Sequence, residues 1–302
     1  MFKGNILITG GSGTLGQAIV QWAQAQQRDC SFTIYSRSEL RQAEMAAKFP
    51  DLRYVIGDVR DEAQLRAAVA GHDMVIHAAA MKRIPDCEAQ PTECYQTNVQ
   101  GSINVVRACI AGQVRQCVGI STDKACAAIT SYGASKRMME GVFQRSSTQR
   151  TIFTLVRYGN VVASNGSVIP LWQRQAAEKH PLTLTNGDMT RFWMSKTSAV
   201  KLIERSLMME PGSISVPAMG SLSIREMAQI VVPGAATIDM GIRSCEKLHE
   251  DLIHRDEDAT VALDASDYFI IHNGRSSGQI TYNSLDAPRL SAKAFLAMLE
   301  EA

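Results

Sequence analysis

Three glycines spaced three residues apart, Gly10, Gly13 and Gly16, follow an apolar run at residues 5–9 and open an amphipathic segment at residues 15–26. A glycine-rich turn between a first strand and a first helix lets the backbone approach a pyrophosphate, to which the helix N-terminus presents free N–H groups. Glycines alone are weak evidence, because any tight turn favours them. Their place after the first strand predicts a dinucleotide site, in which we include Thr14 and Leu15.

The first half of the chain alternates short apolar runs with segments of helical period. This rhythm indicates βαβ units and an α/β fold with a Rossmann-type, doubly wound parallel sheet. After residue 157, glycines and prolines break the rhythm into shorter elements. We predict a dinucleotide-binding core at residues 1–165, with returns to its sheet around 190–218, and a smaller, interleaved C-terminal substrate lobe at 166–302. The predicted strands are 5–9, 32–36, 53–56, 74–77, 116–121 and 152–157, and the helices are 15–26, 39–48, 62–70 and 98–111.

Composition excludes several classes of function. The 302 residues include 31 Lys and Arg against 30 Asp and Glu, a net charge of +1, so nothing indicates a nucleic-acid partner. No apolar run approaches the roughly 18 residues that a membrane span needs. The seven cysteines include no Cys-x-x-Cys pair, a pattern typical of free thiols in a reducing compartment. We therefore expect a soluble cytoplasmic protein without membrane contact.

The end of the second predicted strand indicates which dinucleotide binds. Ser36 and Arg37 stand where an acidic residue would hold the ribose of NAD, and a hydroxyl with an Arg suits the 2′-phosphate of NADP. The alternative is a solvated Arg at a strand end. Asp58, after the third strand, either holds the adenine amino group or caps the next helix. Further predicted cofactor contacts are Val59 and, after the fourth strand, Ala78 and Ala79.

Tyr132 and Lys136 are four residues apart, one helical turn, and so share a helix face. A Tyr phenolate can take a hydroxyl proton while hydride leaves the same carbon. Lowering a Tyr pKa from about 10 to near 7 needs roughly 4 kcal/mol, which a neighbouring ammonium and a positive nicotinamide ring can supply. Such a pair is common on helix surfaces, but downstream of a glycine-rich turn it predicts a dehydrogenase-type site that also contacts the cofactor.

The fifth predicted strand ends in Thr122, Asp123 and Lys124, shortly before Tyr132. A simple dehydrogenase or 4-epimerase needs one hydroxyl here, which Thr122 supplies, and does not need an adjacent acid and base. Asp123 and Lys124 therefore indicate elimination: a neutral Lys124 would take a sugar C5 proton, and a protonated Asp123 would donate to the C6 oxygen. The alternative is a solvated ion pair at a strand end.

Together these motifs resemble the inverting UDP-N-acetylglucosamine 4,6-dehydratases, which are extended short-chain dehydrogenase/reductase enzymes of pseudaminic acid and polysaccharide biosynthesis. The resemblance implies bound NADP in the 1–165 core, a UDP-sugar in the 166–302 lobe and a redox-neutral cycle that inverts C5. It continues through the sequences RYGNV at 157–161, GSVIP at 166–170, MTRF at 189–192, GIR at 241–243 and EKLHE at 246–250. The sugar-nucleotide contacts that it implies are Lys82, Asn160, Val168, Pro170, Arg191, Arg243 and Glu246.

Arg243 is the strongest diphosphate candidate among these, because a guanidinium matches phosphate oxygens in two places. Packing is the alternative role for each residue, and for Val168 and Pro170 it is favoured. Two departures from the family pattern affect the site. Ser244 and Cys245 replace a usual Pro-Gly, which puts the diphosphate contact in doubt, and a proline is missing after the Asp-Lys pair.

Other functions remain as alternatives. A capsule-type 4,6-dehydratase/5-epimerase often carries Met at the position of Tyr132, and a UDP-hexose 4-epimerase does not need Asp123 and Lys124. A non-catalytic NADP-sensing protein would keep the glycines and lose the catalytic residues. We predict no metal site, because His249 and His254 are five residues apart, about 140° around a helix. By analogy with similar enzymes, we expect a homo-oligomer.

Overall fold

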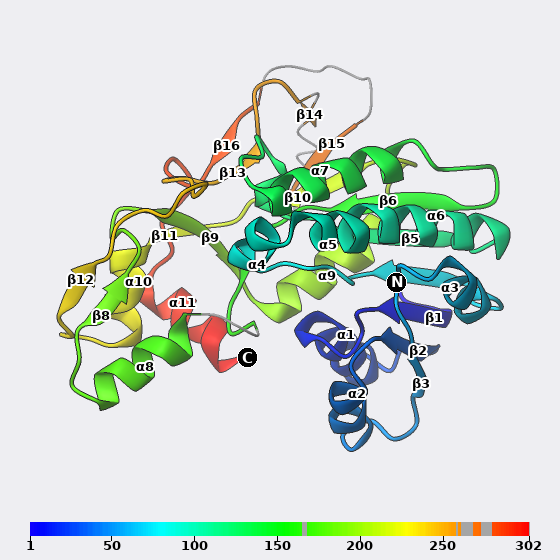
Figure 1. The fold of residues 1–302 in the computed structure, drawn as a ribbon, viewed down its shortest axis with the longest axis horizontal. Coiled ribbons are helices and arrows are strands. Elements are labelled where there is room, and N and C mark those ends of the chain that lie inside the picture. Colours follow the sequence, from blue (N-terminus) through cyan, green and yellow to red (C-terminus); the bar gives the residue numbers. More distant parts are fainter. Residues whose placement is uncertain (165–167, 258, 261–267, 273–279, 302) are drawn as a thin grey trace.

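The computed structural model describes residues 1–164, 168–257, 259–260, 268–272 and 280–301. Within them a nine-stranded sheet has the order β14-β15-β10-β6-β5-β4-β1-β2-β3 (Figure 1). Neighbours from β3 to β10 are parallel, and β15 is antiparallel to β10 and β14. The order 3-2-1-4-5-6 of the first six strands is the doubly wound Rossmann order, which confirms the predicted fold class. The strand bounds are β1 Gly4–Thr9, β2 Cys30–Ser36, β3 Arg53–Ile56, β4 Met74–His77, β5 Gln116–Ile120, β6 Ile152–Val156, β10 Ile214–Pro217, β14 Ala259–Thr260 and β15 Tyr268–Ile271.

Helices cover both faces of this sheet (Figure 1). One layer holds α1, α2 and α9, and the other holds α3, α6 and α7. The central strand β1 is therefore buried on both sides, and its consecutive residues Ile6, Leu7 and Ile8 are fully buried. The helix bounds are α1 Thr14–Ala25, α2 Glu39–Ala46, α3 Glu62–Val69, α4 Ile84–Ala89, α5 Pro91–Tyr95, α6 Gly101–Ala111, α7 Ser131–Gln144 and α9 Lys196–Ser206.

A second hydrophobic core lies beside the sheet, around Trp172, Trp193 and Phe295. Strand β9 joins the two cores, because side chains alternate along a strand: Trp193 enters the second core, while Phe192 and Met194 enter the main one. Three smaller sheets, formed within the described ranges, pair β11-β9-β7, β12-β8 and β13-β16. The bounds are β7 Asn160–Val161, α8 Ile169–Ala177, β8 Leu182–Leu184, β9 Thr190–Met194, β11 Ser221–Ser223, α10 Ile224–Val231, β12 Thr237–Asp239, β13 Asp251–Ile253, β16 Tyr282–Asn283 and α11 Ala292–Glu300.

Two details differ from the sequence-based prediction. The helix predicted over 98–111 begins as regular α6 only at Gly101, after a π-helical segment η1, Gln96–Gln100, that continues from α5. Of the returns predicted around 190–218, α9 packs on the main sheet and β10 joins it, whereas β9 lies in a separate sheet. In the part of the chain that the structure describes, no helix combines the length and the apolar character that membrane crossing requires.

Candidate active site

The β1–α1 turn is packed tightly against the strand beside it. Gly10 has φ +67°, and a Cβ on it would lie 2.8 Å from the Ala79 Cα. A Cβ on Gly16 would overlap the backbone of Gly11. Helix α1 can therefore pack this closely on the turn only because residue 16 is a glycine. Gly13 differs: among the described residues, a Cβ there would meet only the Gly10 carbonyl oxygen, at 3.2 Å.

Gly13 is also the N-cap of α1, and no side chain caps this helix start. The first turn, which contains Thr14 and Leu15, has no acidic residue. An open backbone face at an uncapped helix N-terminus suits an anionic group. The turn thus has the features that a bound pyrophosphate requires.

The ends of β2 and β3 carry the residues predicted to select the dinucleotide. Ser36 is buried, and its hydroxyl lies 2.9 Å from Ser12 Oγ and 3.0 Å from Gln42 Nε2. The Arg37 side chain is 55% exposed and lies 3.7 Å from the Asp58 carboxylate. Ser36 is therefore held by the protein, while Arg37 keeps a guanidinium open to solvent at the edge of the sheet.

Asp58 is not a helix cap, since the N-cap of α3 is Asp61. Arg60 Nε and Nη2 donate to Asp58 Oδ2 at 2.9 and 2.7 Å. Burial acts to raise the pKa of Asp58, but the hydrogen bonds from Arg60 outweigh it and lower that pKa. Val59 is buried against Gly101, so its side chain has a packing role.

Ala78 and Ala79 follow β4 and lie directly against Gly10. Lys82 lies a few residues further along, where burial and then the nearby Arg41 of α2 lower its pKa. Helix α2 begins just after β2. Lys82, which the resemblance assigns to the substrate, is exposed and lines neither of the two cavities described below.

Thr122, Asp123 and Lys124 form a compact polar cluster at the start of η2, a 3-10 turn over Asp123–Ala125. Asp123 is fully buried, and its Oδ1 accepts hydrogen bonds from Thr122 Oγ1 at 2.8 Å and Lys124 Nζ at 2.9 Å. The Oδ2 atom has no hydrogen-bond partner among the described residues. Asp123 is therefore buried, and the Lys124 side chain is 17% exposed, which argues against a fully solvated ion pair.

The charge environment shifts both members of this pair. Burial raises the pKa of Asp123 despite the opposing ammonium of Lys124, and Glu250 adds to the rise. Burial acts to lower the pKa of Lys124, but Asp123 and Glu250 outweigh it, so that pKa is raised. The direction for Asp123 suits a carboxyl that holds a proton. The direction for Lys124 favours the ammonium, whereas the elimination predicted from sequence needs a neutral amine.

Tyr132 and Lys136 lie on α7, and both are buried. Burial first, then Asp123, raises the pKa of Tyr132, against the lowering effect of a hydrogen bond with Thr122. This direction is opposite to the phenolate expected from the sequence. Burial lowers the pKa of Lys136 to about 8, and its Nζ lies 3.0 Å from Met139 Sδ.

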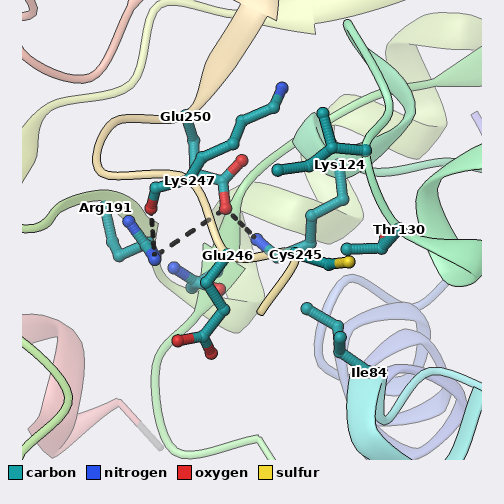
Figure 2. Close-up of a pocket in the computed structure, with 10 residues that line it drawn as sticks. Ile84, Lys124, Thr130, Arg191, Cys245, Glu246, Lys247 and Glu250 are labelled. Carbon is teal, nitrogen blue, oxygen red and sulfur yellow. Dashed lines mark hydrogen bonds and ion pairs between the residues drawn. The ribbon is translucent and has the colours of Figure 1, made fainter. Parts of the chain in front are cut away.

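A cavity opens beside Lys124 (Figure 2). Of the sugar-nucleotide residues predicted from sequence, Asn160, Arg191 and Glu246 line it. Arg243 lines an adjoining cavity with Ile84, Pro85 and Glu88. Val168 packs against the second core and Pro170 is exposed in the first turn of α8, so neither is placed with these residues.

The loop before β13 forms one wall of the cavity, and Arg191 fixes it. Arg191 Nη1 and Nη2 donate to the carbonyl oxygens of Leu248 and Lys247, at 3.2 and 3.1 Å. Cys245 in this loop has φ +63°, a left-handed conformation that favours glycine. This backbone conformation explains why a glycine is usual in the family at this position. In this chain the position carries a cysteine, which lines both cavities.

Sequence reasoning missed two residues of this site. Asn98 accepts from Met81 N and donates to Met81 O, both at 2.8 Å, and also donates to Ser135 Oγ at 2.9 Å, which ties the chain after β4 to α7. Glu250 lies 3.4 Å from Lys124 Nζ. The sequence around Asn98, QTNVQ at 96–100, is polar and gives no signal for the first, and Glu250 is 126 positions from Lys124, so no local pattern connects them.

Within the described ranges, no group of three or more His, Cys, Asp or Glu side chains is arranged to hold a metal ion. His249 Nδ1 lies 2.8 Å from Thr190 Oγ1, and His254 Nδ1 lies 3.2 Å from Asp256. These two histidines therefore have separate protein partners.

A family model described as "Polysaccharide biosynthesis protein" matches residues 6–273. The chain belongs to this family. An inverting UDP-N-acetylglucosamine 4,6-dehydratase of Campylobacter jejuni subsp. jejuni is 40% identical over 277 residues, which cover 89% of this chain and 83% of that protein. The resemblance indicated by the sequence motifs is thus confirmed across most of the chain.

Other relatives of the chain are named for a different reaction. A UDP-glucose 4-epimerase of Rickettsia bellii is 36% identical over 282 residues, covering 88% of this chain and 82% of that protein. Among solved structures, Pen from Bacillus thuringiensis superposes with a TM-score of 0.89 at 30% identity, covering 99% of this chain and 97% of that one. The fold is therefore shared over essentially the whole length.

Proposed function

We propose that the protein is an NADP-dependent UDP-N-acetylglucosamine 4,6-dehydratase that inverts C5 and forms a UDP-4-keto-6-deoxy-hexosamine. The observation that carries this proposal is the Asp123–Lys124 ion pair, in which Asp123 is fully buried and Lys124 opens on a cavity, on a turn that packs against the Tyr132 helix. An acid and a base held together beside a dehydrogenase-type tyrosine suit an oxidation followed by loss of water. The 40% identical dehydratase supports the same substrate class.

The chain's own residues fit a bound dinucleotide. The open face at Gly13 and the uncapped start of α1 would hold the pyrophosphate, and the exposed Arg37 would pair with the 2′-phosphate of NADP. When bound, NADP would accept hydride from the sugar C4 and return it at C6. The proposal includes residues 1–165 as the cofactor-binding core, 166–302 as mainly the sugar-nucleotide lobe, a homo-oligomer and a cytoplasmic location, which the seven free cysteines support.

Tyr132 and Thr122 serve the C4 hydroxyl in this mechanism. Thr122 hydrogen-bonds both Tyr132 and Asp123, so it can hold the tyrosine hydroxyl in place. In the cofactor-free site, burial keeps the Tyr132 proton in place, since it raises that pKa. A positive nicotinamide ring would act in the opposite direction. With the cofactor bound, Tyr132 would be the residue that takes the hydroxyl proton.

Asp123 and Lys124 serve the elimination. The 2.9 Å hydrogen bond between Lys124 Nζ and Asp123 Oδ1 lets one proton move from the ammonium to the carboxylate. This transfer leaves a neutral amine and a protonated carboxyl without an external proton. Lys124 then takes the C5 proton, the C5–C6 double bond forms, and the C6 oxygen leaves as water with the Asp123 proton. The pair ends in the ionic form in which it began.

The substrate contacts that we propose come from both cavities. Arg243 is 66% exposed and 3.9 Å from Glu246, so its guanidinium is available to a diphosphate. Asn160, Arg191 and Glu246 line the cavity that Lys124 enters and would surround the hexose.

The decisive experiment is incubation with UDP-N-acetylglucosamine in D₂O, followed by proton NMR without added cofactor and then with NADP. A 4-keto-6-deoxy sugar nucleotide with deuterium at C5 and inverted C5 couplings is the expected product. A mixture of both C5 configurations would favour the capsule-type 4,6-dehydratase/5-epimerase, and a fully retained C5 configuration would refute the inversion. A C4-inverted sugar that keeps its C6 hydroxyl would favour the epimerase named for the Rickettsia relative. No change with any UDP-sugar would reject an enzymatic function of this type.

Lys124→Ala separates cofactor binding from the elimination. We expect this variant to keep its NADP and to lose formation of the 4-keto-6-deoxy product, because the C5 proton then has no acceptor. The cofactor is measured by chromatography of the supernatant after heat denaturation, and the product by NMR. An unchanged rate would refute the role of Lys124, and recovery of NAD alone from the wild type would refute the NADP assignment.

A further inference from the structure

Glu250 belongs to the EKLHE sequence at 246–250 and has no role in the mechanism above. It stands just before β13 and is 4% exposed. Its backbone is fixed on both sides: Glu250 N donates to Ser284 Oγ, and Ser284 N donates to Glu250 O, each at 2.8 Å. The backbone that carries the carboxylate is therefore held in place.

The side chain of Glu250 extends into the cavity between two cations (Figure 2). Its Oε1 lies 3.4 Å from Lys124 Nζ and 3.8 Å from Arg191 Nε. Its Oε2 is buried and has no hydrogen-bond partner among the described residues. Lys124 thus lies between Asp123 on its own turn and Glu250 from a distant segment.

Other charged groups around this site come from every neighbouring element. Arg191 approaches from β9, Glu246 and Lys247 line the same cavity from the loop before β13, and Tyr132 on α7 is next to Asp123. Lys247 Nζ donates to Cys126 O at 2.7 Å and pairs with Asp251 at 3.6 Å. Glu250 is the carboxylate of this loop for which an ion pair with Lys124 is seen.

We propose that Glu250 is a positioning residue for Lys124, whose carboxylate orients the amine and stabilises the ammonium that forms when Lys124 takes the C5 proton. This inference rests on the proposed dehydratase function. The proton moves from C5 to Lys124 Nζ while the electron pair of the C–H bond forms the C5–C6 double bond. Asp123 holds a proton at this step, so Glu250 is the carboxylate beside the new ammonium until Asp123 gives its proton to the C6 oxygen, and it makes the acceptor more basic.

The sign of the effect follows from the charges. A carboxylate beside an amine favours the ammonium, so replacing Glu250 by the neutral, isosteric Gln lowers the pKa of Lys124. The fall follows from the loss of an opposite charge 3.4 Å from the Lys124 nitrogen. The neutral amine then becomes more abundant at a given pH, but each amine is a weaker base.

Competitive acylation of lysines in the substrate-free protein tests the electrostatic part. At pH 8.5, with a trace of acetic anhydride and peptide mass spectrometry, Lys124 in Glu250→Gln should react about three- to tenfold faster relative to the other lysines than in wild type. Glu246→Gln is the matched control, because it removes a carboxylate from the same cavity without an ion pair to Lys124. An equal change in both variants, or none in Glu250→Gln, would overturn the proposal.

The pH profile of dehydration tests the catalytic part. In Glu250→Gln the high-pH limb, on which activity falls as the pair loses the proton that Lys124 and Asp123 share, should move to lower pH by about one unit, with a plateau kcat about 10- to 100-fold lower and KM little changed. A purely structural role would lower activity without moving this limb. If Glu250→Gln does not fold, Glu250→Asp replaces it. This variant keeps the negative charge but places it farther from Lys124, so it should show a smaller shift of the limb in the same direction. A wild type without dehydratase activity but with the expected acylation change would reject the proposed function and retain the ion-pair effect.

Discussion

Arg157→Met should be among the most destabilising single substitutions in this protein. Arg157 is fully buried after β6 and connects two carboxylates from distant segments. It donates to both oxygens of Glu140 on α7, at 2.8 and 2.7 Å, and to both oxygens of Glu257, at 2.7 Å each. It also donates to Leu252 O at 2.9 Å. These bonds tie the segment after β13 to the helix that carries Tyr132 and Lys136.

The magnitude follows from what the substitution leaves behind. Met fills much of the volume, but the fully buried Glu140 loses the close, buried guanidinium of Arg157. Removing one partner of a buried pair typically costs about 3–5 kcal/mol, against a total stability of about 5–15 kcal/mol for a typical protein. Equilibrium unfolding in urea at pH 7, followed by tryptophan fluorescence and circular dichroism, measures the change in the free energy of unfolding.

Arg137→Met is the matched control, because Arg137 pairs with the same Glu140 from the surface. It is 51% exposed and 3.9 Å away, so its loss should cost less than about 1 kcal/mol. The pH dependence gives a second check. Burial acts to raise the pKa of Glu257, but Arg157 outweighs it and lowers that pKa. The ion pair of Glu257 with Arg157 therefore stabilises the fold above the ordinary carboxyl pKa, and this contribution is lost as the pH falls through the pKa of Glu257 in the folded protein. The difference in the free energy of unfolding between wild type and Arg157→Met should therefore become smaller in acid. A loss below 1 kcal/mol at pH 7 would refute the network's role.

Two further predictions concern backbone positions and use the same urea assay. Gly16→Ala should destabilise the protein by roughly 1–3 kcal/mol, because its Cβ would overlap the Gly11 backbone. Gly141→Ala in α7, whose Cβ would meet only the end of a side chain, at 3.9 Å, should instead stabilise it by about 0.5–1 kcal/mol; equal effects would contradict this account. Cys245→Gly should be neutral or stabilising by up to about 1 kcal/mol. Glycine adopts the left-handed conformation without the steric cost that a Cβ carries, and this gain exceeds the larger conformational entropy that a glycine loses on folding. A clear loss of stability would show that the thiol has compensating contacts.

The parts of the fold that depend on local pattern were predictable. Strand β1 was predicted at 5–9 and spans Gly4–Thr9, because a strand buried on both faces is a continuous apolar run. The start of α6 was not, since residues 96–100 form a π-helical segment whose composition is compatible with a regular helix. Asn98 in this segment hydrogen-bonds to the backbone of Met81, which follows β4. These bonds depend on the tertiary fold, so no local sequence pattern could predict them.

The same distinction applies to the site. Thr122, Asp123 and Lys124 are consecutive, so their proximity follows from the sequence. Their proton affinities do not, because these depend on burial and on Glu250, which only the tertiary fold brings to Lys124. Charge and burial, not residue type, decide whether an Asp-Lys pair is a surface ion pair or an acid and a base.

The site also indicates what kind of ligand would complete it. Two carboxylates, Asp123 and Glu250, and two cations, Lys124 and Arg191, form a neutral buried group. Among the described residues, the buried carboxylate oxygens without a hydrogen-bond partner are Asp123 Oδ2, Glu246 Oε2 and Glu250 Oε2. Leaving such acceptors unpaired costs about 1–3 kcal/mol each. These oxygens have almost no exposed surface, so the side chains that line the cavity, and not these acceptors, must contact a ligand. That lining includes Lys124, Arg191 and Asn160, and such charged and amide groups suit a polar ligand better than an apolar one.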